Sequence, residues 1–232
     1  MVSDGRYVAD ETTFKRYAYT ALGAHFADRA AFDDFYASLE SPGMKDEFLR
    51  VTAFYLFLVK RGDWHVAVDG SAPVVDYLTN SFKLSALFAL IESLSDTENQ
   101  DLYRWLLSRD PTMTFPIADA AALSRLNDTY KDTYGAIRRC VAFFSRLKPE
   151  RQQALCAAIR VDDKPLASVK KVAEFLYELR SKFVHEARLV LSLGGSTALS
   201  AKGQKVVETN LSVETLLDVF EEGVLAYFRG GT

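Results

Sequence analysis

The chain has few residues of the types that most often carry metal or redox chemistry. Among its 232 residues are three histidines and two cysteines, and no HExxH motif or paired CxxC motif is present. Zinc sites are built from such groupings, so the sequence predicts neither a metal site nor a cofactor. Two cysteines, Cys140 and Cys156, are too few for a disulfide framework. We expect buried free thiols in a reducing compartment.

The sequence also lacks the phosphate-binding and nucleophile motifs of common enzymes. The glycines between Gly194 and Gly203 do not have the spacing of a phosphate-binding loop, and they do not connect a strand to a helix. No GxSxG or kinase-type signature occurs. The sequence therefore does not indicate nucleotide binding by a phosphate-binding loop, and it does not indicate a serine hydrolase.

Long hydrophobic runs and a strong charge of one sign are also absent. The longest uninterrupted apolar run, 53–59, is far shorter than the ~20 residues of a membrane span. Residues 1–11 contain charged residues and no apolar core, so no signal peptide is indicated. The net charge, 28 − 31 = −3, excludes a strongly basic nucleic-acid binder but leaves room for a local basic cleft. We expect a soluble cytoplasmic protein with no membrane segment.

What the sequence does contain is helical periodicity along most of its length. Apolar residues recur at helical spacing from residue 11 onward, which predicts an all-α bundle of about eight to ten helices. The expected helices are 11–39 as two helices, 44–60, 74–95, 101–107, 119–147 as one long helix or a bent pair, 150–159, 165–189 and 212–228. Segments 188–193 and 204–211 favour strands and predict a small hairpin or a mobile loop. Residues 1–10 and the linker 111–118 have no such pattern.

We expect two units, an N-terminal helical extension (1–72) packed on a helical domain (73–232). Within the second, the stretch Leu176-Tyr177-Glu178-Leu179-Arg180-Ser181-Lys182-Phe183-Val184-His185-Glu186 places polar residues beside a buried helical stripe. Arg180 and His185 are five positions apart, so they project roughly 140° apart around a helix. Ser181 and His185 share a face. A site that uses both Arg180 and His185 therefore needs the reach of the arginine, a bend, or a second copy of the helix.

Each of these residues also has a purely structural interpretation. Glu178, Lys182 and Glu186 are spaced four apart, which predicts an ion-paired, solvated helix face. Glu92 interrupts an apolar stretch and fits the solvent side of an amphipathic helix. His25 and His65 have no neighbours at metal-ligand spacing, and a structural histidine is the simpler interpretation for both.

The Arg180 stretch resembles the signature of the HEPN superfamily, an arginine and a polar residue followed by a histidine with four to six residues in between. Its residue pattern is most similar to that of the ApeA-like HEPN branch. That branch also has an earlier helix with a Leu/Ile-Glu-x-Leu element, which Ile91-Glu92-Ser93-Leu94 matches. The resemblance covers roughly residues 74–229, and the specific motif within it is about ten residues long. Residues 1–72 match nothing in that family.

The resemblance implies a homodimeric, metal-independent endoribonuclease of the defence or toxin type, phage defence included, that acts on single-stranded RNA. His185 would act as general base or acid and Arg180 would hold the scissile phosphate. The supporting or phosphate-binding residues would be Ser181, Glu92, Lys182 and Tyr177.

Two features depart from the family pattern. Ser181 stands where catalytic members often have Asn, Asp or His, and Arg188 stands where one branch has a tyrosine. Control by modification of a tyrosine at that position is therefore not expected. The alternative is a non-catalytic HEPN-like RNA-binding or dimerisation module, and a third possibility is a structural helical protein in which the motif is coincidental.

Overall fold

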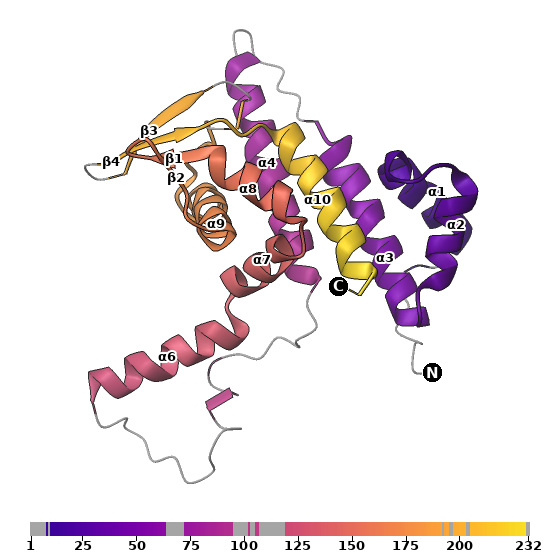
Figure 1. The fold of residues 1–232 in the computed structure, drawn as a ribbon, viewed down its shortest axis with the longest axis horizontal. Coiled ribbons are helices and arrows are strands. Elements are labelled where there is room, and N and C mark those ends of the chain that lie inside the picture. The colour runs from indigo at the N-terminus through magenta and orange to yellow at the C-terminus, as the bar shows by residue number, and fades with distance from the viewer. Residues whose placement is uncertain are drawn as a thin grey trace.

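The computed structural model describes residues 8, 10–63, 72–94, 102, 105–106, 119–191, 193–194, 197–202 and 205–230. Across them the chain is mostly helical with one small antiparallel sheet (Figure 1), which confirms the expected helical class. The helices are α1 (Glu11–Leu22), η1 (Gly23–His25), α2 (Arg29–Ser38), α3 (Pro42–Phe54), η2 (Tyr55–Lys60), α4 (Ala72–Ser93), α6 (Ala120–Tyr134), α7 (Ala136–Ser145), α8 (Pro149–Ala157), α9 (Val169–Glu186) and α10 (Val213–Phe228). Of these, η1 is a 3₁₀ turn and η2 a π-helical segment.

Short polar residues define where most of these helices begin. In six helices the N-cap side chain accepts a hydrogen bond from the backbone N–H three residues later, which satisfies a donor that the helix itself cannot. These caps are Asp10, Asp28, Ser41, Asp119, Ser168 and Ser212. The last of these caps stands at the start of the helix that was expected over 212–228.

Helix α10 lies in the centre of the molecule. Figure 1 shows it between α1–α3 on one side and α4, α7, α8 and α9 on the other. Its Phe228 and Phe220 meet Phe48 of α3 and Tyr55 of η2, with ring centroids 5.1 and 4.7 Å apart. The N-terminal helices are thus packed on the bundle through one shared hydrophobic core.

A glycine permits the close approach of α10 to α7. A Cβ added at Gly223 would lie 2.3 Å from the buried ring of Phe143. No larger residue fits there without moving that ring.

The sheet connects the segments before and after α9. Its strands are β1 (Ile159–Val161), β2 (Lys164–Pro165), β3 (Ala198–Lys202) and β4 (Lys205–Thr209), in the antiparallel order β2-β1-β4-β3. The turn between β1 and β2 places Asp162 and Asp163 at positive φ (49° and 63°), as a two-residue hairpin loop of type I′ requires.

Several expected boundaries were wrong. The helix predicted over 165–189 begins at Val169, because Pro165 is held in β2, and it ends at Glu186. The hairpin near 188–211 exists, but its first strand is β3 rather than 188–193. Residues Val190 and Leu193 are instead buried in the core, and the N–H of Val190 donates to Ser81 Oγ of α4 at 2.8 Å.

The pair of helices over 119–147 breaks at Gly135, and α6 extends away from the body of the molecule (Figure 1). The apolar periodicity predicts that Leu123 and Ile137 face inward, but they are 50% and 39% exposed. Leu123 lies on α6, the helix that extends away from the body, and Ile137 lies in the first turn of α7, directly after the break at Gly135. His65, the linker 111–118 and most of 101–107 lie outside the described residues, as do nearly all of residues 1–10.

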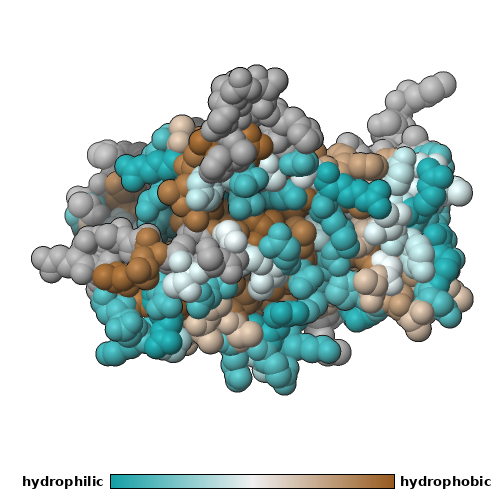
Figure 2. All heavy atoms as spheres, turned by 90° about the horizontal axis from the view of Figure 1, so that it is seen from above, coloured by the Kyte–Doolittle hydropathy of each residue, from teal (hydrophilic) through white to brown (hydrophobic). Residues whose placement is uncertain are grey.

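One helix has the composition of a membrane span. Val74–Ser93 of α4 has a mean hydropathy of 1.3 in its most apolar window, a third of which is buried. Helices in the core of soluble proteins share that composition, and Leu84, Phe88 and Ile91 of α4 are in the core. Viewed from above, hydrophilic residues surround hydrophobic ones gathered toward the centre of the face (Figure 2). The cytoplasmic location therefore stays a prediction.

Candidate functional site

Helix α9 carries the motif residues on a scaffold fixed at both ends. Ser168 caps its start, and the side chains of Val172, Ala173 and Leu176 are buried against the bundle. Its end is closed by Ala187 in the left-handed conformation, whose N–H donates to the carbonyl of Phe183 at 3.1 Å. Because α9 is regular in between, the helical spacing of its residues can be used directly.

Arg180 lies at the boundary between α9 and α4. Its guanidinium packs over the ring of Tyr177, 5.5 Å from the centroid, and that ring meets Phe88 of α4 at 5.9 Å. The Nε of Arg180 is buried and has no hydrogen-bond partner among the described residues. Such an atom is costly to bury, so it marks a place where stability is not optimal.

Glu92, near the end of α4, is in the same condition. Its Oε1 is buried without a hydrogen-bond partner among the described residues. Its backbone carbonyl accepts a hydrogen bond from Arg139 Nη1 of α7 at 3.2 Å. The expectation that Glu92 is on a solvated face is therefore wrong for this oxygen atom.

The pKa values of two neighbours locate Glu92 and Arg180 in one cluster. Burial first, then the charge of Glu92, raise the pKa of the Cys140 thiol to about 12, while Arg180 opposes the shift. Burial and Glu92 likewise raise the pKa of the Tyr177 phenol, again against Arg180. The structure therefore brings together Glu92, Tyr177 and Arg180 from the predicted set, and it adds Cys140 and Arg139.

His185 is placed differently. It is an exposed residue in the last turn of α9, outside the cluster around Arg180. The five-residue spacing in a regular helix directs the two side chains roughly 140° apart. One chain thus presents the arginine toward α4 and the histidine toward solvent.

The two remaining candidates lie between these positions. Ser181 is partly exposed, and no hydrogen bond of its side chain is found within the described chain. Lys182 forms an ion pair with Glu178 at 2.9 Å, as the spacing predicts, but Glu186 pairs with Arg188 at 3.0 Å instead of with Lys182. Lys182 and Glu178 are each about a third exposed, so this pair adds at most about 1 kcal/mol.

Sequence reasoning missed Arg139 and Cys140. The signal available was weak, a pair of arginines and a cysteine in an amphipathic helix, and it contains no spacing typical of a site. Their relation to Glu92, 47 positions away from Arg139, exists only in the fold.

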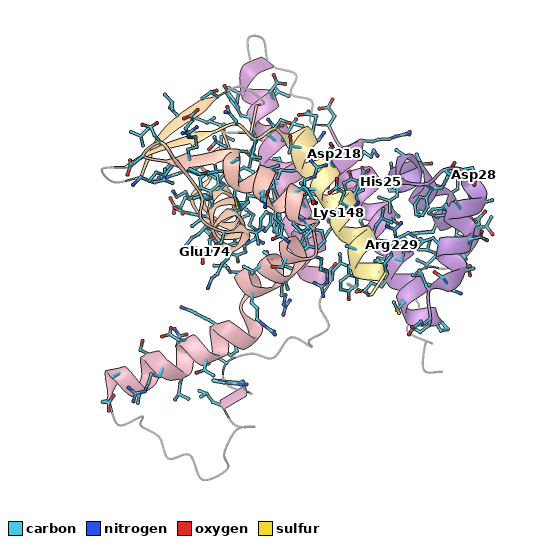
Figure 3. The ribbon with its side chains drawn as sticks, in the orientation of Figure 1. His25, Asp28, Lys148, Glu174, Asp218 and Arg229 are labelled. Carbon is cyan, nitrogen blue, oxygen red and sulfur yellow. The ribbon has the colours of Figure 1, made fainter. Side chains whose placement is uncertain are left out.

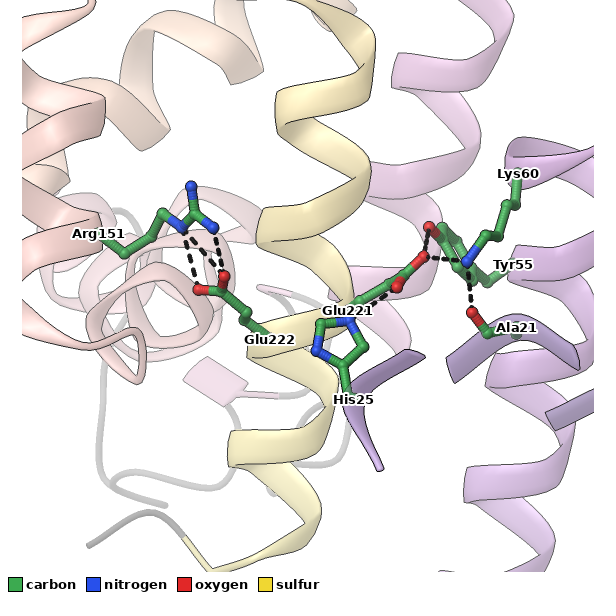
Figure 4. Close-up of polar contacts among 7 residues, drawn as sticks. All are labelled: Ala21, His25, Tyr55, Lys60, Arg151, Glu221 and Glu222. Atoms are coloured by element: carbon green, nitrogen blue, oxygen red, sulfur yellow. Dashed lines mark hydrogen bonds and ion pairs between the residues drawn. The ribbon is translucent and has the colours of Figure 1, made fainter. Parts of the chain in front are cut away.

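A second cluster of charges is buried around Glu221 of α10 (Figure 4). Its Oε1 accepts hydrogen bonds from Tyr55 Oη and, at 2.8 Å, from Lys60 Nζ, and Oε2 lies 2.8 Å from His25 Nε2. Lys60 also donates to the carbonyl of Ala21. Both carboxylate oxygens are thus satisfied by the N-terminal helices, so we interpret this cluster, including His25, as structural.

Neither cluster has the composition of a metal site. No group of three His, Cys, Asp or Glu side chains at metal-binding proximity occurs in the part of the chain that the structure describes. Comparisons with family models, with curated proteins and with solved structures find no match. A function is therefore inferred from the motif and from the geometry of the residues described above.

Proposed function

We propose that the protein is a metal-independent endoribonuclease of HEPN type, with a defence or toxin role, that acts as a homodimer. One observation carries the proposal. Arg180, whose Nε has no hydrogen-bond partner among the described residues, and His185, exposed at the end of the same helix, offer an anion-binding group and a proton-transfer group on one regular scaffold.

The chemistry needs only these two groups. His185 would act as the general base that takes the proton of a ribose 2′-hydroxyl, the role that histidine most often has in acid–base catalysis. The 2′-oxygen then attacks the adjacent phosphorus, the bond between phosphorus and the 5′-oxygen breaks, and the 5′-oxygen takes up the proton that the imidazole accepted. The guanidinium of Arg180 stabilises the negative charge that builds on the phosphoryl oxygens. The products end in a 2′,3′-cyclic phosphate and a 5′-hydroxyl.

The angle between the two side chains favours a site built from two copies. Around a twofold axis the same face of each subunit contacts the other, so His185 of one chain can approach Arg180 of its partner. In this arrangement Ser181 and Lys182 lie between the two groups along the helix. Tyr177 holds the guanidinium in place through stacking. Glu92 would support the site from the end of α4.

The alternative is a non-catalytic RNA-binding or dimerisation module. The stacking of Arg180 on Tyr177 favours it, because this contact also suits a purely structural arginine. In that case replacement of Arg180 or His185 weakens the dimer and leaves no cleavage to lose.

The test is incubation of the purified protein with mixed RNA in EDTA, followed by analysis of the RNA ends. We expect cyclic-phosphate ends from the wild type and none from His185→Ala. Lys170→Ala, an exposed residue on the same helix, is the matched control and should cleave like the wild type. No cleavage by the wild type, or equal cleavage by His185→Ala, argues against the enzyme.

A further inference from the structure

A hollow of about 800 Å³ opens where the N-terminal helices meet the bundle. Its lining comes from η1, the turn between α7 and α8, α8, and the second half of α10. A neighbouring hollow of about 940 Å³ shares Arg146, Leu147 and Lys148 with it. We call the two together the α8–α10 groove. In size each suits a ligand rather than a single ion.

The charged residues of the first hollow are mainly basic. They are Arg146, Lys148, Arg151, Arg229, Glu150 and Glu222, with His25 at the side. Arg151 and Glu222 neutralise each other through two hydrogen bonds of 3.1 Å from Nε and a further contact from Nη2 (Figure 4). Besides this pair, the lining contains the cations Arg146, Lys148 and Arg229 and the carboxylate Glu150, in a chain whose net charge is −3.

The second hollow adds one acid, Glu47. It lies 4.0 Å from Arg50, which offsets its charge. The side shared by the two hollows is therefore positive, and a local potential of this kind attracts anions even when the whole protein is acidic.

Two of the arginines are held in place by aromatic rings. Arg146 lies over Tyr227 at 5.1 Å and Arg229 over Phe35 at 5.5 Å. Arg146 Nη1 also donates to the carbonyl of Ala142 at 3.1 Å. The guanidinium of Arg229, stacked on its ring, keeps its N–H donors in its own plane, where they can contact a phosphate. Figure 3 shows His25, Lys148 and Arg229 around the second half of α10, and both Lys148 and Arg229 are exposed.

We propose that the α8–α10 groove binds the phosphodiester backbone of a single-stranded RNA, at a place separate from the Arg180 and His185 residues. The cations are distributed over the α7–α8 turn and the end of α10 instead of converging on one point, which suits successive phosphates more than a single one. The choice of RNA among polyanions rests on the proposed function.

The rest of the lining is apolar. Leu147, Leu225 and Ala226 line the first hollow, and Tyr227 lines the second. Leu147 and Leu225 are buried and Arg146 covers one face of Tyr227, so the groove offers its cations to the phosphates of a strand and little surface on which bases could stack.

The experiment measures binding of a fluorescein-labelled oligouridylate of about 20 nucleotides by anisotropy, in EDTA and in the His185→Ala background so that no strand is cut. Lys148→Glu combined with Arg229→Glu should weaken binding at least about tenfold. It should also lower the slope of log Kd against log salt by about 2, one for each lost phosphate contact. The neutral pair Lys148→Gln and Arg229→Gln should give a smaller loss of the same kind.

Lys164→Glu, an exposed lysine of β2 that lines neither hollow, is the matched control and should bind within twofold of the parent. If the parent and the Lys148→Glu, Arg229→Glu variant bind the RNA equally, the proposed RNA-binding role of the groove is wrong. It is also wrong if the parent does not bind the RNA.

The two proposals fail separately. If RNA binds in the groove but the wild type does not cleave it, only the proposed ribonuclease activity is contradicted. If RNA is cleaved but the groove variants bind it as well as the parent does, only the proposed binding groove is contradicted.

Discussion

Glu221 and Arg180 are both charged residues drawn into the same helical bundle, and their surroundings differ. Each oxygen of Glu221 has a partner from the N-terminal helices, namely Tyr55 and Lys60 at one and His25 at the other. Arg180 Nε and the nearby Glu92 Oε1 are buried with no hydrogen-bond partner among the described residues. One cluster is complete within a single chain, and the other is not.

This difference supports a function at Arg180 only together with the motif, because Thr79, Ser85 and Thr209 also bury an oxygen that has no hydrogen-bond partner among the described residues. A buried charge with all its hydrogen bonds made holds elements together, whereas half-satisfied polar groups cost stability and persist where something else requires them. The helix that carries Arg180 also ends in Ala187 at a φ of 54°, a conformation that L side chains rarely adopt. We infer that the Arg180 region meets a partner, a second copy or RNA, that supplies the absent contacts.

The largest expected effect comes from breaking the complete cluster. Glu221→Ala leaves Tyr55 Oη buried without a partner and removes the anion beside Lys60, so the free energy of unfolding should fall by about 3 kcal/mol. We place it at the low end of the range for buried pairs because the Lys60 side chain is 32% exposed and can turn to water. Urea denaturation measures this change.

The adjacent Glu222→Ala is the control. Its pair with Arg151 is about 30% exposed on both sides, so the loss should stay within about 1 kcal/mol. Equal losses in the two variants would remove the distinction between the clusters.

A smaller effect is expected from pH at the incomplete cluster. Burial and Glu92 raise the pKa of Cys140 to about 12, above the ~8.5 of a free thiol, so the folded state keeps a proton that the unfolded state releases. This stability is fully present below about pH 8.5 and is lost as the pH rises toward 12. Between pH 8 and 10 the wild type, under reducing conditions, should lose about 1 to 2 kcal/mol more than Cys140→Ala. If the free energy of unfolding falls with pH by the same amount in both proteins, folding does not raise the pKa of Cys140 and the prediction is wrong.

The smallest effect is expected at Arg180 itself. Arg180→Met keeps an apolar contact with Tyr177 and removes the unpartnered Nε, so the free energy of unfolding should stay within about 1 kcal/mol of the wild type. RNA cleavage should nevertheless be lost. A loss of stability as large as that of Glu221→Ala would make Arg180 a structural residue, and the proposed function would lose its main support.

Apolar periodicity was enough to predict most of the helices and the helical class. Asp28, Ser41 and Ser212 mark helix starts by local chemistry that the sequence displays directly. The β1–β2 hairpin was missed because its strands have three and two residues and its turn uses Asp-Asp rather than a glycine. Its pairing with β4 depends on chain segments separated by a whole helix.

The site was predictable only where one helix determines it. The spacing of Arg180 and His185 followed from the sequence, and the proximity of Glu92 was expected only from the family resemblance. The buried cluster could not be predicted, because Glu221 meets Tyr55 and His25 across 166 and 196 positions. Nor does residue type distinguish buried Glu221 from its partly exposed neighbour Glu222.

The most direct test of the central claim mixes two inactive variants, Arg180→Ala and His185→Ala, and measures RNA cleavage in EDTA. If each site takes Arg180 from one subunit and His185 from the other, random pairing makes half of the dimers mixed, and each mixed dimer has one intact site. We predict recovery of about a quarter of the wild-type activity. A mixture as inactive as its two components, beside an active wild type, would contradict a site shared between two chains.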